Sequence, residues 1–488
     1  MAPPQPNQAS PASFYWHDYE TWGSTPALDR PCQFAGLRTD GDLNEVGEPL
    51  VLFARPADDL LPQPDACLVT GITPQRAVRD GLPEADFARA IQRELAAPGT
   101  CGVGYNSLRF DDEVTRYLFY RNLLPPYAHT HRNGNSRWDL IDALRLAHAL
   151  RPDGIQWPER EPGVTSFKLE DLTAANDIPH AGAHDALADV RATIAMARLL
   201  KAAQPRLFGY ALGLRVRRTV EDLIARGEPL LHVSQRYPAA AGCIAPVAVV
   251  ATADDNPKQR WCFDLRADPR VLLDLSAAEI HARVFTAGDD LPEGVERIPL
   301  KGLKTNAVPM LAPIKTLGAD AAERWQIDLD RVRRHAAVVQ GHAAEIAAKV
   351  REVHRREPDT APRDPERMLY GGGFFADGDM RLMERLHALS PQALAAEHPR
   401  FQDPRLPTLL FRMRARSWPE TLTDAEREDW DAWRFERLTD PEQGASVTID
   451  AFDARIAELR PTLADDPARV RVLDELSAWG EQIMDAAP

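Results

Sequence analysis

Two acidic residues enclosed by aromatic residues near the start of the chain most limit what this protein can be. The segment FYWHDYETWG covers residues 14–23 and contains Asp18 and Glu20. Its aromatic character predicts a strand that leads into a core. Alternate residues of a strand face the same side, so the two carboxylates point the same way, about 6.6 Å apart along the backbone. Removing an unpaired carboxylate from water costs several kcal/mol, so the pair needs a partner.

A divalent metal ion is one partner that such a pair can bind. Long acidic side chains can converge on one or two cations, which lie about 4 Å apart in two-metal sites. Hard cations such as Mg2+ prefer oxygen ligands. The DxE spacing alone is weak evidence, because most such pairs are surface residues of a strand. Other segments have to supply further ligands.

Two later segments offer them. NSLRFDDE (106–113) places Asp111 and Asp112 where a loop becomes a helix, and helix capping is an alternative role for one of the two. HDALAD (184–189) places His184 just ahead of a helix and Asp189 in its first turn. This spacing suits a loop histidine that lies over a carboxylate, although a helix cap beside a solvent-exposed histidine would give the same pattern.

The pattern along the chain predicts an α/β layer, then a small β unit, then helices. Strands are expected at 14–21, 33–39, 48–56 and 101–107, and helices at 86–95, 111–124 and 184–203. Residues 229–312 carry short strand-like pieces interrupted by Gly, Pro and Asp. Helices dominate from about residue 320, including one over 331–356, and 357–367 is a Pro-rich, charged linker.

Charge and cysteine content restrict the class of protein. The formal net charge of -15 and pI of about 5.4 look unfavourable for binding a polyanion, but a local basic groove remains compatible with them. Five scattered cysteines without a CxxC pair predict neither a disulfide framework nor a thiolate zinc site. The start, MAPPQPNQASPAS, lacks the pattern of a signal peptide, and no apolar run is long enough for a membrane span. We expect a cytoplasmic protein.

Together these segments resemble the histidine-bearing branch of the DEDD superfamily of 3′-to-5′ exonucleases. That branch pairs DxE on the first strand with an Asp in mid-domain and a late H-x-x-x-x-D. Longer strings are similar, in the same order, to the bacterial exodeoxyribonuclease I family: HDYETWG, PALDRPCQFAGLRTD, GYNSLRFDDEVTR, NSRWDLID, LRPDGIQWP and LYGGGFF. The resemblance covers most of the chain.

This resemblance implies three parts and a set of partners. A ribonuclease-H-like α/β exonuclease domain would cover 14–203, an SH3-like, mostly β domain 204–357, and an α-helical C-terminal domain 358–488. In the family the later parts close around single-stranded DNA. The resemblance further implies a monomer that acts in DNA repair and recombination and binds the acidic tail of single-stranded DNA-binding protein.

Carried over residue by residue, the resemblance implies a catalytic site. Asp18, Glu20, Asp111 and Asp189 would hold two Mg2+ ions, for which Mn2+ can substitute, and His184 would be the general base. Four carboxylates and two divalent ions together have no net charge. The ions would therefore be the partner that the buried pair needs. Without metal, at least one carboxylate should have a raised pKa. The implied reaction is hydrolysis of single-stranded DNA from its 3′ end to 5′-mononucleotides.

Contacts to the DNA strand are expected from basic and aromatic residues beside these motifs. The candidates are Glu20, Lys168, Arg116, Tyr127 and Arg145. Lys168 stands where the family is expected to have Arg, so a phosphate contact would keep its charge but lose its bidentate geometry. Surface salt bridges or core packing are the alternative roles of these side chains.

Two other functions and two other motifs are compatible with parts of this sequence. An exoribonuclease of the same branch would share all five catalytic residues. A non-catalytic module that binds nucleic acid or protein, built on a nuclease fold that has lost its activity, would not need them. YGGGFFADGD (370–379) lacks the GK[ST] of a phosphate-binding P-loop and reads as a flexible turn. HAGAH (180–184) places two histidines four apart without an HExxH pattern, so a zinc site is not expected.

Overall fold

A computed structural model describes residues 11–180, 185–355 and 363–485. The chain forms two compact units. Unit 1 contains Arg137–Pro179 together with residues from Ala192 to Thr360, and unit 2 contains Ser10–Ser136, His180–Arg191 and Ala361–Pro488. Each unit is therefore assembled from segments that are far apart in the sequence.

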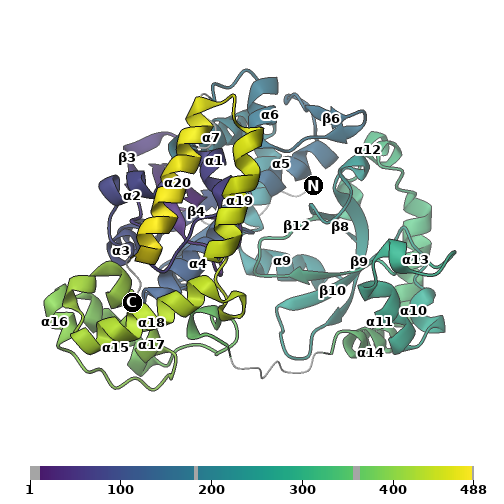
Figure 1. Cartoon of the computed structure of the whole chain (residues 1–488). Helices are drawn as coiled ribbons and strands as arrows, with labels where there is room; N and C mark the ends of the chain where they lie inside the picture. The colour runs from purple at the N-terminus through teal and green to yellow at the C-terminus, as the bar shows by residue number, and fades with distance from the viewer. Residues whose placement is uncertain (1–10, 181–184, 356–362, 486–488) are drawn as a thin grey trace. The chain divides into compact units, whose positions relative to one another are not determined.

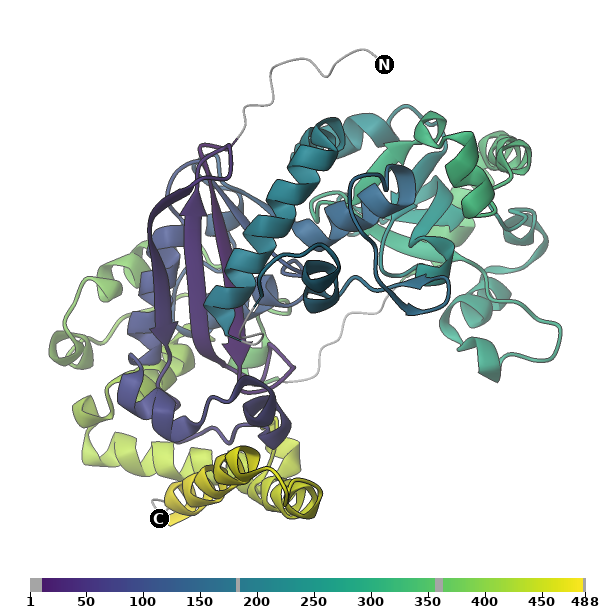
Figure 2. The same ribbon diagram turned by 90° about the horizontal axis from the view of Figure 1, so that it is seen from above.

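The sheet of unit 2 is organised around the strand predicted from the aromatic run. That strand, β1 (Ser13–Thr21), lies between β2 (Pro31–Thr39), which is antiparallel to it, and β4 (Thr100–Gly104), which is parallel. β3 (Glu45–Phe53) pairs with the far side of β2. Figure 2 shows these N-terminal purple strands side by side. The strand prediction around Asp18 is thus confirmed.

The two faces of β1 have different surroundings. Tyr15 and Tyr19 lie in a buried cluster with Phe34, and residues of α3 (Glu84–Leu95) and α4 (Asp111–Arg121) complete it. Because successive side chains alternate, Asp18 and Glu20 belong to the opposite face. The register between β1 and β2 shifts at Glu20/Thr21, and such irregularities in a ladder can redirect a side chain.

The last helices of the chain share hydrophobic cores with this first part. Trp22 and Cys32 lie in one cluster with Phe452 and Trp479. These C-terminal helices are α15 (Asp377–His387), α16 (Pro391–Ala395), α17 (Leu406–Ser417), α18 (Asp424–Thr439), α19 (Ile449–Thr462) and α20 (Pro467–Asp485). Figure 1 shows α19 and α20 side by side, and both contact α1 (Pro64–Thr70), while α20 also contacts α2 (Pro74–Asp80).

Unit 1 contains the predicted small β structure. Its five-stranded antiparallel sheet has the order β11-β10-β9-β8-β12. The strands are β8 (Leu230–Val233), β9 (Ile244–Thr252), β10 (Gln259–Asp264), β11 (Leu300–Lys304) and β12 (Met310–Pro313). Helix α5 (Leu140–Leu150) packs against β8 and β12. The indole of Trp325 donates to the carbonyl of Ala149 at 2.9 Å, which ties the α5 segment to the later part of the unit.

Further helices of unit 1 surround this sheet. They are α6 (Leu169–Ala175), α8 (Pro205–Gly213), α9 (Arg217–Ile224), α10 (Val271–Asp274), α11 (Ala277–Phe285), α12 (Ala319–Arg324), α13 (Leu329–Gly341) and α14 (Ala343–Val353). The prediction of a single helix over 331–356 is wrong, because this segment forms two helices, α13 and α14, that are separated at His342. Gly341, which has a poor helix propensity, ends the first of them. Helix α7 (Ala186–Ala203) begins in unit 2 and continues in unit 1.

Two findings bear on the class of protein. All five cysteines are free and buried. In the part of the chain that the structure describes, no helix has both the length and the apolar character that crossing a membrane requires.

Candidate metal centre

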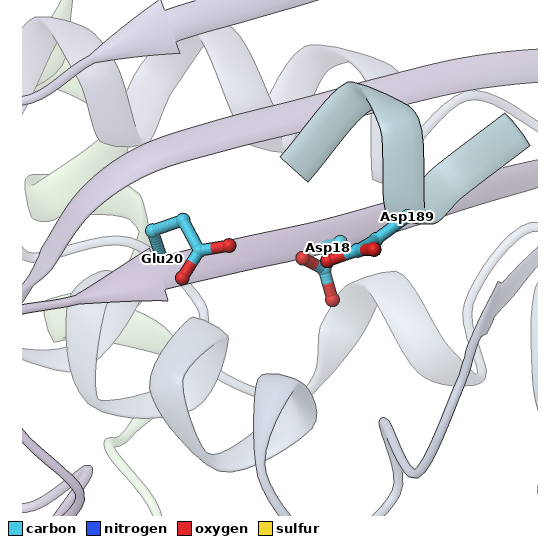
Figure 3. A group of neighbouring side chains, drawn as sticks. All are labelled: Asp18, Glu20 and Asp189. Carbon is cyan, nitrogen blue, oxygen red and sulfur yellow. The ribbon is translucent and has the colours of Figure 1, made fainter. Parts of the chain in front are cut away.

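Three carboxylates from two remote segments meet in unit 2. One oxygen from each of Asp18, Glu20 and Asp189 lies within 4.8 Å of the others. Figure 3 shows the side chain of Asp189 reaching from the first turn of α7 toward Asp18, with Glu20 further along β1. The alternation of β1 and the position of Asp189 in the first turn of α7 together create this group, which contains three of the four carboxylates expected as metal ligands.

Asp111 is the fourth acidic residue, and a backbone group of β1 holds its side chain in place. It is the first residue of α4 and is buried. One of its carboxylate oxygens, Oδ1, accepts a hydrogen bond from the backbone N–H of Tyr19 at 3.1 Å. The N-cap of α4 is Phe110, so the capping role considered for Asp111 is not the one it has. Its hydrogen bond instead fixes the carboxylate beside β1.

Burial and mutual repulsion raise the pKa of three carboxylates of this centre, those of Asp18, Glu20 and Asp111. Burial, followed by the charges of Asp111, Glu20 and Asp189, raises the pKa of Asp18 well above its ordinary value. Burial and the charge of Asp189 raise the pKa of Glu20 to about 8. Burial raises the pKa of Asp111 to about 7, and Asp112 adds to the effect. Clustered oxygens of raised pKa suit a hard divalent cation, which would remove the repulsion among them.

A histidine that the sequence interpretation passed over contacts this centre. The Nε2 atom of His180 lies 2.5 Å from Oδ1 of Asp189, and the His180 side chain is almost fully buried. His180 belongs to the HAGAH segment, whose two histidines do not predict a zinc site. His180 precedes Asp189 by nine residues, so the five-residue spacing that singled out His184 gave no signal for this contact. His184, the predicted general base, lies outside the described residues.

Three of the five predicted DNA contacts lie in unit 2: Glu20 of the metal centre, Arg116 and Tyr127. Arg116 of α4 pairs with Glu113 and donates a hydrogen bond to the hydroxyl of Tyr370 at 3.1 Å. The hydroxyl of Tyr127 donates to the carbonyl of Leu369 at 3.2 Å. Arg116 therefore forms a salt bridge, which is the alternative to DNA contact that the sequence allowed for it. Both residues also contact the segment around residue 370, for which the sequence predicts a flexible turn.

The other two lie in unit 1. Arg145 of α5 is buried and donates to Asp142 Oδ1 at 2.8 Å, with its guanidinium 5.5 Å from the ring centre of Phe167. Lys168 precedes α6 and is exposed. Their roles toward a DNA strand stay predictions.

The fold and the carboxylate centre define the class of this protein as an exonuclease. The family model described as "Exonuclease" matches residues 15–197, and those for the exonuclease I SH3-like and C-terminal domains match 215–356 and 363–483. The chain belongs to the exodeoxyribonuclease I family. These matches confirm the predicted order of an exonuclease domain, an SH3-like domain and a C-terminal domain.

Relatives of known sequence and structure agree over nearly the whole chain. Exodeoxyribonuclease I of Escherichia coli is 41% identical over 475 residues, which are 97% of this chain and 98% of the relative. The structure of exonuclease I from Methylocaldum szegediense has 47% identity and a TM-score of 0.92, covering 97% of this chain and all of that one. A zinc-bound complex of the E. coli enzyme with single-stranded DNA has 40% identity and a TM-score of 0.91, with coverage of 97% and 99%.

Proposed function

We propose that this exonuclease hydrolyses single-stranded DNA from the 3′ end in a Mg2+-dependent reaction and releases 5′-mononucleotides. The observation that carries the proposal is the approach of the Asp18, Glu20 and Asp189 oxygens to within 4.8 Å of one another, with the buried Asp111 beside them. The related E. coli protein has been solved in complex with single-stranded DNA, which supports the same substrate here.

Two Mg2+ ions would be held by Asp18, Glu20, Asp111 and Asp189, and Mn2+ could replace them. When bound, the ions supply positive charge that stabilises the developing charge of a phosphodiester under attack. The chain's own residues position the groups. The Tyr19 N–H holds Asp111, and His180 holds Asp189. His184 takes the proton of the attacking water, while the 3′ oxygen of the preceding nucleotide leaves and is protonated. Glu20 additionally contacts the terminal nucleotide.

The wider role follows from the same family. We infer that the enzyme acts as a monomer in the cytoplasm, in DNA repair and recombination. Single-stranded DNA-binding protein would be its partner through the acidic tail of that protein. With a net charge of -15, this chain can hold DNA only through local basic patches, so its affinity for DNA should fall steeply with salt.

A digestion of end-labelled oligonucleotides tests the proposal. Single-stranded DNA labelled at its 3′ end should lose the label in the first released nucleotides, whereas a 5′ label should remain on shortening fragments. EDTA should stop both reactions, and Mg2+ should restore them. A matched RNA oligonucleotide should be cut far more slowly. Removal of the 5′ label first, activity in EDTA, or faster digestion of RNA would contradict the proposal.

A further inference from the structure

Asp111 is the first residue of α4, and a neighbouring strand holds the start of this helix. The N-cap residue is Phe110, whose side chain has no polar atom to accept from the first N–H groups of the helix. Helix starts commonly depend on a side-chain cap, because these N–H groups have no partner within the helix. The placement of Asp111 therefore depends on contacts outside α4.

Tyr19 of β1 makes two such contacts, and they lie one helical turn apart. Its backbone N–H donates to Asp111 Oδ1 at 3.1 Å, and its side-chain hydroxyl lies 3.0 Å from Oγ1 of Thr115. Asp111 and Thr115 are four residues apart, so they lie on the same face of α4, about 6 Å apart along its axis. Two contacts at this spacing restrict both the rotation of the helix and its distance from the strand.

The side chain that makes the second contact has a fixed position. Tyr19 is buried, and its ring packs against Phe34, the residue opposite it on β2, with ring centres 4.9 Å apart. Thr115 is buried as well, so water does not compete for the two hydroxyl groups. A hydrogen bond in such surroundings is stronger than one in water.

Tyr19 also lies between two ligands of the proposed metal centre. Asp18 and Glu20 precede and follow it on β1, and their side chains belong to the opposite face of the strand. Tyr19 is thus part of the segment that supplies two carboxylates, and it contacts the helix that supplies a third.

We propose that the hydroxyl of Tyr19, through Thr115, is a positioning group for Asp111 and sets the separation of this carboxylate from those of Asp18 and Glu20 at which Mg2+ binds. The inference deepens the proposed function and rests on it. Mg2+ demands near-ideal octahedral geometry, with oxygen ligands at about 2.0–2.1 Å, so a small displacement of one ligand weakens binding. The backbone contact at Asp111 alone would leave α4 free to rotate about that point.

Mg2+ binding measured without DNA tests this proposal, because it needs no catalysis. The full-length protein is purified free of metal, and Mg2+ binding is followed by titration calorimetry and by the rise in melting temperature. Tyr19→Phe keeps the ring and deletes the hydroxyl, and it should weaken Mg2+ binding about 2- to 10-fold, the factor for one hydrogen bond. Thr115→Val removes the other hydroxyl from a side chain of similar shape and should have the same effect.

Tyr15→Phe is the matched control. Tyr15 lies on the same strand and face as Tyr19 and is buried in the same cluster. Its hydroxyl, however, has no hydrogen-bond partner within the described ranges of the chain. Deleting it should leave Mg2+ binding unchanged, so this variant separates the loss of a buried hydroxyl from the loss of a bond to α4.

The double variant Tyr19→Phe/Thr115→Val shows how the effect reaches the metal centre. If the two hydroxyls act through their shared hydrogen bond, the double variant should bind Mg2+ no more weakly than the weaker single variant. With DNA present, saturating Mg2+ should restore most of the wild-type kcat, because every ligand is intact. A merely structural role would lower the melting temperature of the metal-free protein and leave its response to Mg2+ unchanged.

Three outcomes would overturn the proposal. Tyr19→Phe could bind Mg2+ as tightly as wild type, Tyr15→Phe could weaken binding equally, or the losses of the two single variants could multiply in the double variant. In each of these cases wild-type digestion of single-stranded DNA would still support the proposed function. A wild-type protein that neither binds Mg2+ nor digests such DNA would refute both.

Discussion

His180 Nε2 lies 2.5 Å from Oδ1 of Asp189, one of the three carboxylates that meet at the metal centre. Asp189 occupies the first turn of α7, whereas His180 comes from the segment preceding that helix. The contact engages one of the two carboxylate oxygens of Asp189. A histidine in this place restricts the rotation of the carboxylate, which is how groups behind metal ligands set the geometry of a site.

Replacing His180 should therefore weaken metal use without unfolding the protein. For His180→Ala we expect activity at low Mg2+ to fall about 10- to 100-fold, the usual effect of removing such a supporting group. The Mg2+ concentration giving half-maximal rate should rise. His180→Gln keeps a donor and should recover part of the loss. Unchanged Mg2+ dependence in both variants would show that the contact has no such role.

Removing a carboxylate of the centre should abolish hydrolysis and leave the fold intact. Asp18→Ala and Asp189→Ala each delete a proposed ligand, so nuclease activity should disappear in Mg2+. Circular dichroism should be unchanged, and Asp18→Asn should raise the melting temperature of the metal-free protein, because it removes a buried carboxyl group whose ionised form this site disfavours. Asp42→Ala, at an exposed position between β2 and β3, is the matched control. Mg2+-dependent activity retained by either ligand variant would remove the assignment.

The metal-free protein should lose stability as pH rises. The folded-state pKa is about 8 for Glu20 and about 7 for Asp111, compared with roughly 4 for both residues in an unfolded chain. Below pH 4 these groups are protonated in both states and contribute no penalty. As pH increases above 4, the carboxyls ionise in the unfolded chain before they ionise in the folded protein. The loss of folding free energy therefore grows between pH 4 and pH 8 and is complete above pH 8.

Melting temperatures in EDTA between pH 5 and pH 9 check this dependence. They should fall with pH, and Mg2+ added at pH 8 should raise them, since the ions bind the folded state. The change with pH should be smaller in Asp18→Asn, in which fewer charges repel Glu20 and Asp111. A melting temperature that rises over this interval, or that ignores Mg2+, would contradict the electrostatic account of the centre.

Local patterns made much of the fold and centre predictable. The aromatic run gave β1, and alternation along it placed Asp18 and Glu20 on one face. Helical spacing placed Asp189 in the first turn of α7. The meeting of these carboxylates depended on the family resemblance, because no local rule joins residues 18 and 189.

What could not be predicted depends on contacts between distant segments. The interpretation of YGGGFF as a flexible turn could not include Arg405, whose hydrogen bonds hold it. Likewise, the sharing of a core between Trp22 and Phe452 joins the two ends of the chain. Periodicity showed that the last helices have apolar sides, but it could not show that the first part of the chain would cover them.

A buried ionic cluster also joins the first part of the chain to the C-terminal helices within unit 2. Asp59 accepts hydrogen bonds from Nη1 of Arg30 at 2.8 Å and from Nη2 of Arg416 at 2.8 Å, and it is fully buried. Burial alone would raise the pKa of Asp59, but Arg30 and Arg416 hold it well below its ordinary value. Its contribution to stability is therefore present above pH 4 and is lost as pH falls toward the folded-state pKa.

Asp59→Ala should lower the free energy of unfolding by about 3–5 kcal/mol, because it leaves two arginines buried without their shared partner. Asp65→Ala is the matched control, since Asp65 also joins an early segment to a late one through Arg455, at 2.7 Å, but on the exposed surface. Asp65→Ala should lower the free energy of unfolding only slightly, because solvent screens exposed ion pairs. Urea unfolding at pH 7 measures both variants. Equal losses would mean that the Asp59 cluster does not hold the C-terminal helices to the first part of the chain, and the shared hydrophobic cores alone would then do so.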